Sequence, residues 1–224
     1  MFTVNPLPPQ INKDLLDLLA QVEPATVGHF RHWGFMDPGL RPIIPGRRAA
    51  GTAVTVRVPG ADGTIQNYAL GEVRPGDFLV IDRCGDLRHA SWGGLTSAAA
   101  REAGLSGVIT DGVACDFEEV RAAGVPVWCR GSSAITVKTL GIAGELNVPI
   151  SCGGIVVKPG DAILADESGI LVLDPGEIRA VAERALAMQA REKEILAGLR
   201  AGKKLPSLTG SAELIRAAMQ REHT

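Results

Sequence analysis

The glycine pair Gly93-Gly94 opens an apolar segment that ends in a loop carrying two aspartates, Asp111 and Asp116. Residues 93–116 read GGLTSAAAREAGLSGVITDGVACD, in which an apolar helical pattern is followed by a short β-branched run. A helix that begins at glycine leaves backbone N–H groups free to bind an anion. A loop aspartate offers the oxygen ligand that a hard divalent cation prefers. This stretch therefore predicts a helix–strand unit beside a site for a small carboxylate and a metal ion.

Composition narrows the class of protein. A chain of 224 residues with 46% hydrophobic residues suits one globular domain, or one domain with a helical tail. The net charge of −2 and the aromatic content of 4% argue against nucleic-acid binding. No apolar run reaches the roughly 20 residues that span a bilayer, so we expect no membrane partner. The first ten residues lack a secretory pattern, and the four cysteines form no C-x-x-C pair. We therefore expect reduced thiols and a cytoplasmic protein.

The order of patterns indicates an α/β fold in which the centre alternates helix and strand. A β-rich layer follows over residues 148–173, and a helical tail closes the chain. Helices are expected after a cap at Asn12 and at residues 26–33, 65–71, 95–104, 116–123, 177–199 and 211–222, and strands at residues 52–58, 107–110 and 125–129.

Several motifs resemble the RraA-like family. They are Asp111-Gly112, Asp116, the NVP at residues 147–149, and the stretch GGIVVKPGDAILADESGILVL at residues 153–173. This family includes the regulator of ribonuclease E activity and class II pyruvate aldolases that act on 4-hydroxy-4-methyl-2-oxoglutarate. Many members were once described as menaquinone methyltransferases. The resemblance covers residues 24–175.

The resemblance implies a swivelling β/β/α domain with a C-terminal helical tail. Residues 1–224 would form one RraA-like domain, with its core at residues 24–175 and its C-terminal helices at residues 176–224. It also implies a homotrimer or homohexamer with the active site in a cleft where subunits meet.

Aldolases of this family carry an Asp, twenty further residues and then Arg-Asp. Asp116 matches the final Asp, which implies that it holds Mg²⁺ or Mn²⁺. Cys115 stands where the family has Arg, and Gly94 stands where the family has the first Asp. In these aldolases the metal and the arginine hold a 2-oxo acid and stabilise the enolate. Cys115 carries no positive charge and does not replace that arginine.

The segment before the glycine pair contains two candidate catalytic residues. Arg88 could supply the missing guanidinium and bind the substrate, and His89 could act as a general acid or base. The structural alternatives are a surface salt bridge for Arg88 and a loop cap for His89. Arg130 is a second candidate for the missing cation. Asp111 is a further candidate catalytic residue, although it could simply fix a turn.

The helix start and the loop after the strand also have two interpretations. Gly93, Gly94, Leu95 and Thr96 could bind the substrate carboxylate through backbone N–H groups, or the glycines could permit a close helix–sheet contact. Asp116 could ligate the metal, or it could be the N-cap of a helix with Glu119 in a capping-box variant.

The leading hypothesis is a divalent-metal-dependent lyase. It would cleave a small 2-oxo or hydroxy carboxylic acid by retro-aldol reaction or decarboxylation through a metal-bound enolate. One alternative is a non-catalytic regulator that docks a protein partner, since the ribonuclease regulator also lacks parts of the aldolase signature. Another is an isomerase, tautomerase or hydratase acting on a related acid, because Gly94 and Cys115 replace the family's Asp and Arg.

Overall fold

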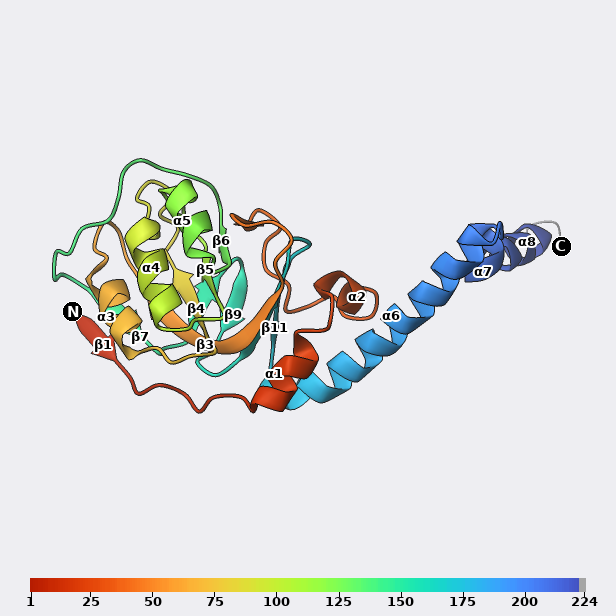
Figure 1. Cartoon of the computed structure of the whole chain (residues 1–224), viewed down its shortest axis with the longest axis horizontal. Coiled ribbons are helices and arrows are strands. Elements are labelled where there is room, and N and C mark those ends of the chain that lie inside the picture. The colour runs from red at the N-terminus through yellow and green to blue at the C-terminus, as the bar shows by residue number, and fades with distance from the viewer. Residues whose placement is uncertain (222–224) are drawn as a thin grey trace. The chain divides into compact units, whose positions relative to one another are not determined.

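One long strand, β3 (Ala49–Arg57), has hydrogen-bonded neighbours on both of its edges (Figure 1). Along one edge it runs parallel to β4 (Asp77–Asp82). Along the other it pairs antiparallel with β10 (Ala162–Ala165) over its first half and with β7 (Gly144–Leu146) near its end. Its residues are small or β-branched and mostly buried, as expected for a strand covered on both faces. Strand β3 therefore lies at the centre of the fold.

The parallel part of the sheet continues from β4 to β5 (Gly107–Thr110) and then to β6 (Val127–Cys129). Each pair of neighbouring strands is joined by a helix, in the order α3 (Thr64–Glu72), α4 (Gly94–Glu102) and α5 (Phe117–Ala123). Strands and crossovers that advance in one direction with the usual right-handed twist place their helices on the same face. Figure 1 shows these three helices together on one side of the sheet.

The two faces of the sheet have separate cores because side chains alternate along each strand. Leu79 and Val108 pack in the cluster that contains Ile65 of α3 and Val120 of α5. Phe78, Val80, Ile109 and Trp128 pack instead in the cluster formed with the late strands. The layer order is thus β/β/α, which confirms the predicted fold class.

The remaining elements are short, except for α6 and α8. They are β1 (Phe2–Val4), α1 (Lys13–Leu19), α2 (Pro24–Gly28), β2 (Arg41–Pro42), β8 (Ile150–Cys152), β9 (Ile155–Val157), β11 (Ile170–Leu173), η1 (Pro175–Glu177), α6 (Ile178–Arg200), α7 (Leu205–Thr209) and α8 (Ser211–Arg221).

The expected helix over residues 26–33 is wrong in both bounds, because α2 begins at Pro24 and ends at Gly28. Beyond it, the Arg31 guanidinium makes two hydrogen bonds of 2.9 Å to the Glu177 carboxylate and lies 4.5 Å from the Trp33 ring centre. These side-chain contacts draw the chain toward η1. The predicted cap at Asn12 is confirmed, since its Oδ1 accepts from the Asp14 N–H at 2.8 Å.

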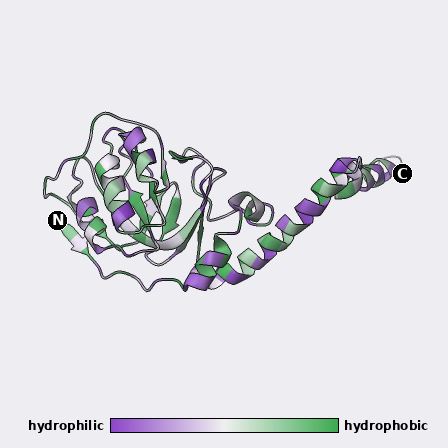
Figure 2. Ribbon diagram, in the orientation of Figure 1, coloured by the Kyte–Doolittle hydropathy of each residue, from purple (hydrophilic) through white to green (hydrophobic). Residues whose placement is uncertain are grey.

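The computed structural model describes residues 1–221, which fall into two compact units, the first Met1–Ala182 and the second beginning at Glu183. Helix α6 begins in the first unit, and α7 and α8 belong to the second. The last residue of the expected helix 211–222, Glu222, lies outside the described residues. Within the described part, no helix combines the length and apolar composition needed to cross a membrane. Figure 2 shows hydrophobic residues along the strands and an alternation of polar and apolar residues along α6.

Asp62, which is 4% exposed, fixes the loop before β7 to the start of α3. Its carboxylate accepts hydrogen bonds from the N–H groups of Leu140 (3.1 Å), Ile142 (2.6 Å) and Ala143 (3.1 Å), and from that of Thr64 (3.0 Å). Burial opposes ionisation, but these hydrogen bonds outweigh it and hold the pKa of Asp62 well below its usual range. Asp62 is therefore ionised in the native state throughout the neutral range.

We predict that Asp62→Asn lowers the free energy of unfolding at pH 7 by about 2 kcal/mol or more, because buried N–H groups lose a charged acceptor. A carboxylate whose pKa is lowered by folding stabilises the native state above its unfolded pKa of about 4. This stabilisation is lost as the pH falls through that value toward the folded pKa. Urea unfolding between pH 7 and pH 3 should therefore show a smaller acid loss in the variant than in the wild type. The exposed Asp14→Asn serves as the control, and equal acid losses in wild type and Asp62→Asn would contradict this account.

Candidate functional site

Helices α4 and α5 begin in direct contact, and the glycine pair makes this possible. A Cβ atom on Gly93 would lie 2.6 Å from Cys115 Sγ and 2.7 Å from Asp116 Oδ2. A Cβ atom on Gly94 would lie 2.7 Å from the Glu119 Cβ. All three distances are shorter than contacts between real side chains. At Gly94 the neighbour is a Cβ atom that cannot rotate away, so this position in particular requires glycine. The small residues therefore permit a close approach, and their neighbour is another helix start rather than the sheet.

Asp116 occupies the N-cap position of α5, but its side chain does not bond to its own helix. Its backbone is left-handed, with φ of +50°, whereas a capping residue is normally extended. The carboxylate is exposed and is turned toward α4, where Oδ2 accepts from the Gly94 N–H at 3.2 Å and from Cys115 Sγ at 3.2 Å. The predicted N-cap bond and capping box with Glu119 are therefore wrong.

The start of α4 is the predicted anion site, and two of its four N–H groups are bound within the protein. The Gly93 N–H donates to Thr96 Oγ1 at 2.9 Å, and that hydroxyl donates back to the Gly93 carbonyl at 3.0 Å. The Gly94 N–H donates to Asp116. Leu95, in the first turn, is 86% exposed. A carboxylate thus lies at this positive helix end, as electrostatics favours, and it belongs to the protein itself.

Cys115 differs from an arginine in charge and from a catalytic thiol in pKa. Burial, together with the hydrogen bond to Asp116 and the negative charges of Asp116 and Glu119, raises the pKa of the Cys115 thiol to about 11. The thiol is therefore protonated and neutral at physiological pH. It donates a weak hydrogen bond to Asp116 and neither replaces the missing cation nor acts as a nucleophile.

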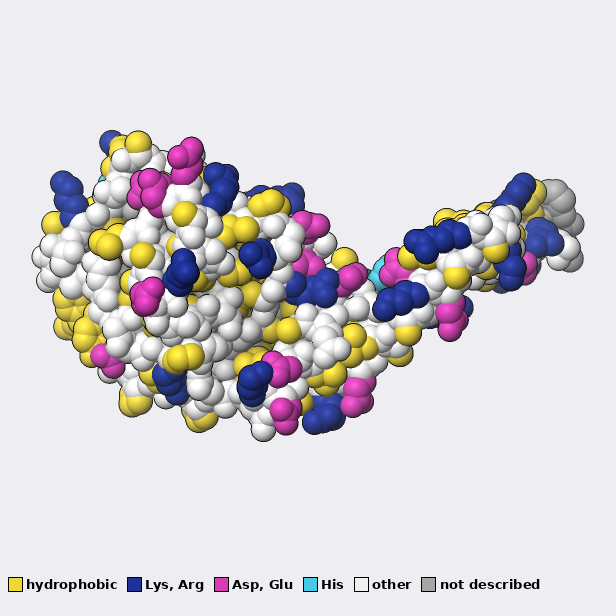
Figure 3. Space-filling model, viewed as in Figure 1, with side chains coloured by type: hydrophobic (Ala, Val, Ile, Leu, Met, Phe, Trp, Pro, Cys, Tyr) yellow, Lys and Arg dark blue, Asp and Glu magenta, His cyan; other side chains and the backbone are white. Residues whose placement is uncertain are grey.

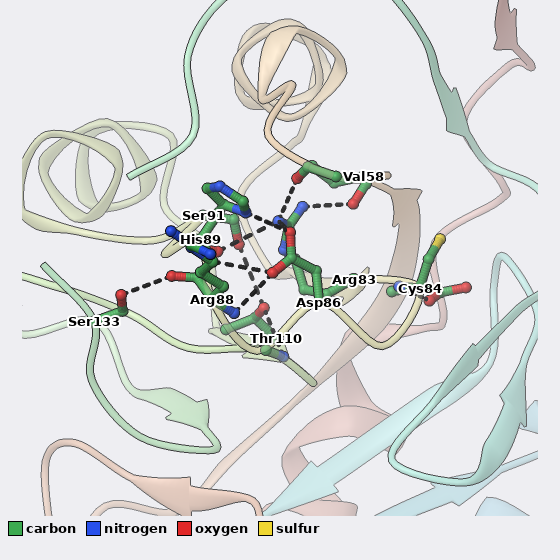
Figure 4. Close-up of polar contacts among 12 residues, drawn as sticks. Val58, Arg83, Cys84, Asp86, Arg88, His89, Ser91, Thr110 and Ser133 are labelled. Carbon is green, nitrogen blue, oxygen red and sulfur yellow. Dashed lines mark hydrogen bonds and ion pairs between the residues drawn. The ribbon is translucent and has the colours of Figure 1, made fainter. Parts of the chain in front are cut away.

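A second group of polar residues lies in the turn after β4 (Figure 4). The Nδ1 atom of His89 lies 2.8 Å from Asp86 Oδ2, so His89 is paired with a carboxylate. Asp86 Oδ1 accepts from the N–H groups of Arg88 (2.7 Å) and His89 (3.0 Å). The Arg88 carbonyl accepts from Ser133 Oγ at 2.7 Å, while the Arg88 side chain is exposed. Among residues 1–221, the Arg88 guanidinium makes no ion pair, so the salt-bridge interpretation of Arg88 is wrong.

Asp111 directly follows β5 and is joined to the same turn through Arg83. Its Oδ1 accepts from the Arg83 N–H at 2.8 Å, and burial raises the pKa of its carboxyl. Arg130 is held beside it, since its Nε donates to the Asp111 carbonyl at 2.9 Å and a terminal nitrogen lies 3.4 Å from Asp37 Oδ1. These contacts direct the Arg130 guanidinium toward Asp37.

The two groups of polar residues are connected by backbone hydrogen bonds between the segment that leads into α4 and the segment that leads into α5. The Ser91 N–H donates to the Val113 carbonyl at 3.3 Å, and the Cys115 N–H donates to the Trp92 carbonyl at 2.8 Å. Trp92 is buried, and its indole nitrogen donates to Ser97 Oγ at 2.8 Å, which fixes the entry into α4. Within the described chain, no hydrogen bond or ion pair joins His89 or Arg88 directly to Asp116. The structure therefore places Asp116 against the start of α4, where it accepts from Gly94. Arg83 contacts both Asp111, through its backbone N–H, and the His89 carbonyl, through its guanidinium.

The donor atoms at Asp116 suit one type of metal ion. No three His, Cys, Asp or Glu side chains in the described part of the chain are arranged to hold an ion together. A zinc site built from protein ligands alone is therefore not supported at Asp116. Mg²⁺ and Mn²⁺ are commonly bound by one or two carboxylates, with water and substrate oxygens completing the shell. Asp116, with Glu119 one helical turn away, fits that pattern.

Sequence reasoning missed three residues of these groups. Arg83 is fully buried although it follows a strand end where a charged residue is usually exposed. Asp86 precedes His89 by three residues in a Gly-Asp turn, and this spacing is the local signal that could have paired them. The sequence spacing of Glu119 matches a capping box, whereas its packing against Gly94 depends on a tertiary contact that spacing does not reveal.

Comparison with known proteins gives consistent matches. The family model described as RraA-like, Aldolase/RraA, matches residues 14–172. A 4-hydroxy-4-methyl-2-oxoglutarate aldolase of Thermus thermophilus is 37% identical over 127 residues, which are 56% of this chain and 76% of that protein. A crystal structure of an uncharacterized protein from Pseudomonas syringae covers 92% of this chain and 99% of its own, with a TM-score of 0.76 and 25% identity. Streptomyces coelicolor RraAS2, an unusual member of the RNase ES inhibitor RraA family, covers 83% of this chain and 97% of its own, with a TM-score of 0.74 and 25% identity.

The contact between Gly94 and Glu119 predicts a pair of coupled substitutions. Gly94→Asp alone should lower the free energy of unfolding by about 1–3 kcal/mol, because the new side chain overlaps Glu119. Glu119→Gly should relieve most of this cost in the double variant, as thermal or urea unfolding would measure. Gly71→Asp in α3 is the control, since a Cβ on Gly71 meets no atom within 4 Å. Equal costs of Gly94→Asp with and without Glu119 would refute the overlap.

Proposed function

Because the chain belongs to the Aldolase/RraA family of RraA-like proteins, we propose that it is a divalent-metal-dependent lyase. Its substrate would be a small 2-oxo or hydroxy carboxylic acid, cleaved by retro-aldol reaction or decarboxylation. The supporting observation is the Asp116 carboxylate, which is exposed, is turned away from its own helix and lies at the N-terminus of α4.

Asp116 would hold Mg²⁺ or Mn²⁺, with Glu119 beside it. When bound, such an ion stabilises negative charge on a substrate oxygen. The first turn of α4, from Gly93 to Thr96, would orient the substrate carboxylate with the help of the helix dipole. The exposed guanidinium of Arg88 would add the positive charge that Cys115 lacks.

The polar residues in the turn after β4, together with Asp111, would transfer the proton. His89 carries an imidazole, the side chain most often used in general acid–base catalysis, and it is held by a carboxylate. Asp111, whose pKa is raised by burial, is a second carboxyl that could give or accept a proton. A reaction that uses both Asp116 and His89 would need a substrate that reaches from the start of α4 to the turn after β4.

The exposed apolar side chains of α8 support the expected homo-oligomer. Leu214, Ile215 and Met219 are 70%, 62% and 59% exposed. Apolar side chains gathered on one helix favour burial against another chain. In contrast, acidic and basic side chains are interspersed on the face drawn in Figure 3. We propose a trimer or hexamer, and light scattering should give three or six times the 23.5 kDa chain mass.

We expect the protein to release pyruvate from 4-hydroxy-2-oxo acids or from oxaloacetate with Mg²⁺ present. Asp116→Asn should reduce this rate on the order of 100-fold or more, because it removes the charged ligand. Glu118→Gln, an exposed neighbour in the first turn of α5, is the matched control and should keep the rate. A rate no greater than buffer, or one unaffected by Asp116→Asn, would end the lyase proposal.

A second candidate, a non-catalytic protein-binding regulator, is favoured by Cys115 and Gly94, which remove two of the three aldolase groups. The likeness to RraAS2 also supports it. Calorimetry with Mn²⁺ separates the two functions. Heat of binding that disappears in Asp116→Asn supports the lyase, and a folded protein that binds no Mn²⁺ supports the regulator.

A further inference from the structure

In the turn after β4, His89 is held by hydrogen bonds with Asp86 and Arg83. Asp86 Oδ1 accepts from two backbone N–H groups, and Asp86 Oδ2 faces His89 Nδ1 at 2.8 Å (Figure 4). Burial opposes ionisation of Asp86. The hydrogen bonds from Arg88 and His89 and the charge of Arg83 outweigh it and lower the pKa of Asp86 to about 2. Asp86 is therefore an ionised carboxylate at neutral pH.

Arg83 holds this carboxylate from the interior side. Its side chain has no exposed surface, and its guanidinium donates to the carbonyls of Val58 and Gly60. One terminal nitrogen also lies 3.3 Å from Asp86 Oδ2 and 3.3 Å from the His89 carbonyl. A rigid, fully buried fork therefore fixes both the carboxylate and the backbone of the histidine.

The charge state of Asp86 determines which nitrogen of neutral His89 carries the proton. An ionised carboxylate accepts hydrogen bonds and donates none. The atom that faces it, Nδ1, must then be the donor, and Nε2 keeps its lone pair. The His89 side chain is 27% exposed, compared with 15% for Asp86 and 0% for Arg83, so solvent access increases outward along this series.

We propose that Asp86 and Arg83 are positioning residues that hold His89 in the Nδ1–H tautomer and leave Nε2 as the free base. This rests on the proposed function, in which His89 transfers the proton. In a retro-aldol step, Nε2 takes the proton of the substrate hydroxyl. The electron pair of the breaking C–C bond passes to the enolate of the 2-oxo acid. The imidazolium, stabilised by Asp86, then returns that proton to the enolate carbon.

The tautomer can be measured without any turnover. In ¹⁵N-labelled protein, the ring nitrogens of His89 are assigned by their loss in His89→Gln. We expect Nδ1 to be protonated and Nε2 unprotonated in the neutral ring. Asp86→Asn keeps Oδ1 for the turn and replaces Oδ2 with an NH₂ donor. The ring should then change to the Nε2–H tautomer, and the lyase rate should fall on the order of 100-fold or more.

A matched control is Asp174→Asn, which changes a similar turn that has no histidine. The Asp174 Oδ1 accepts from the Gly176 N–H at 2.9 Å, and an asparagine can accept the same bond. This variant should leave both the His89 tautomer and the rate unchanged.

The outcomes separate this proposal from the proposed function. An Nε2–H tautomer in the wild type, or an unchanged Nδ1–H tautomer in folded Asp86→Asn, would overturn the positioning role. A tautomer change in a protein that shows no lyase activity would support the positioning role and reject the lyase. If Asp86→Asn does not fold, the wild-type spectrum still decides the tautomer.

Discussion

The absence of two Cβ atoms at Gly93 and Gly94 permits the contact on which this end of the molecule depends. It lets α5 begin against the start of α4, so that Asp116, Cys115 and Glu119 all lie at one helix terminus. The left-handed backbone at Asp116 then turns its carboxylate across to the neighbouring helix. A larger residue at Gly94 would overlap the Glu119 Cβ and separate the two helix starts.

The candidate functional residues lie beyond the carboxyl ends of the parallel strands, where α/β sheets usually bind ligands. The loops that follow β4 and β5 carry Asp86, His89 and Asp111, and open α/β sheets bind ligands at these carboxyl ends. The same loops lead into α4 and α5, so the strand order places the proposed proton-transfer residues and the Asp116 carboxylate along one edge of the sheet. The family's arginine and first aspartate are replaced by Cys115 and Gly94, and Arg88 and Glu119 are among the charged residues that this chain carries nearby.

The sequence was sufficient for the features that depend on periodicity. The β-branched run at residues 107–110 and the helical pattern after Gly94 predicted β5 and α4 because local spacing reflects burial. The sequence was insufficient where a contact between residues far apart in the chain determines the local structure. The left-handed Asp116 is a consequence of packing against α4, and α2 is shortened by Arg31 reaching Glu177. Strands of two or three residues, such as β2 and β7, are too short to have a period. The burial of Arg83 depends on carbonyls from another loop, which no local pattern encodes.

The double-sided pairing of β3 also has a consequence for how the chain folds. Its parallel partner β4 follows soon after it, but β7 and β10 come from much later in the sequence. Strand β1 likewise cannot pair until β7 has been synthesised. Contacts between distant segments require large loops to close, which slows folding. During synthesis, the half-formed sheet would keep an unpaired edge of β3 until the last strands emerge from the ribosome. This interval is when the nascent chain is most exposed to aggregation.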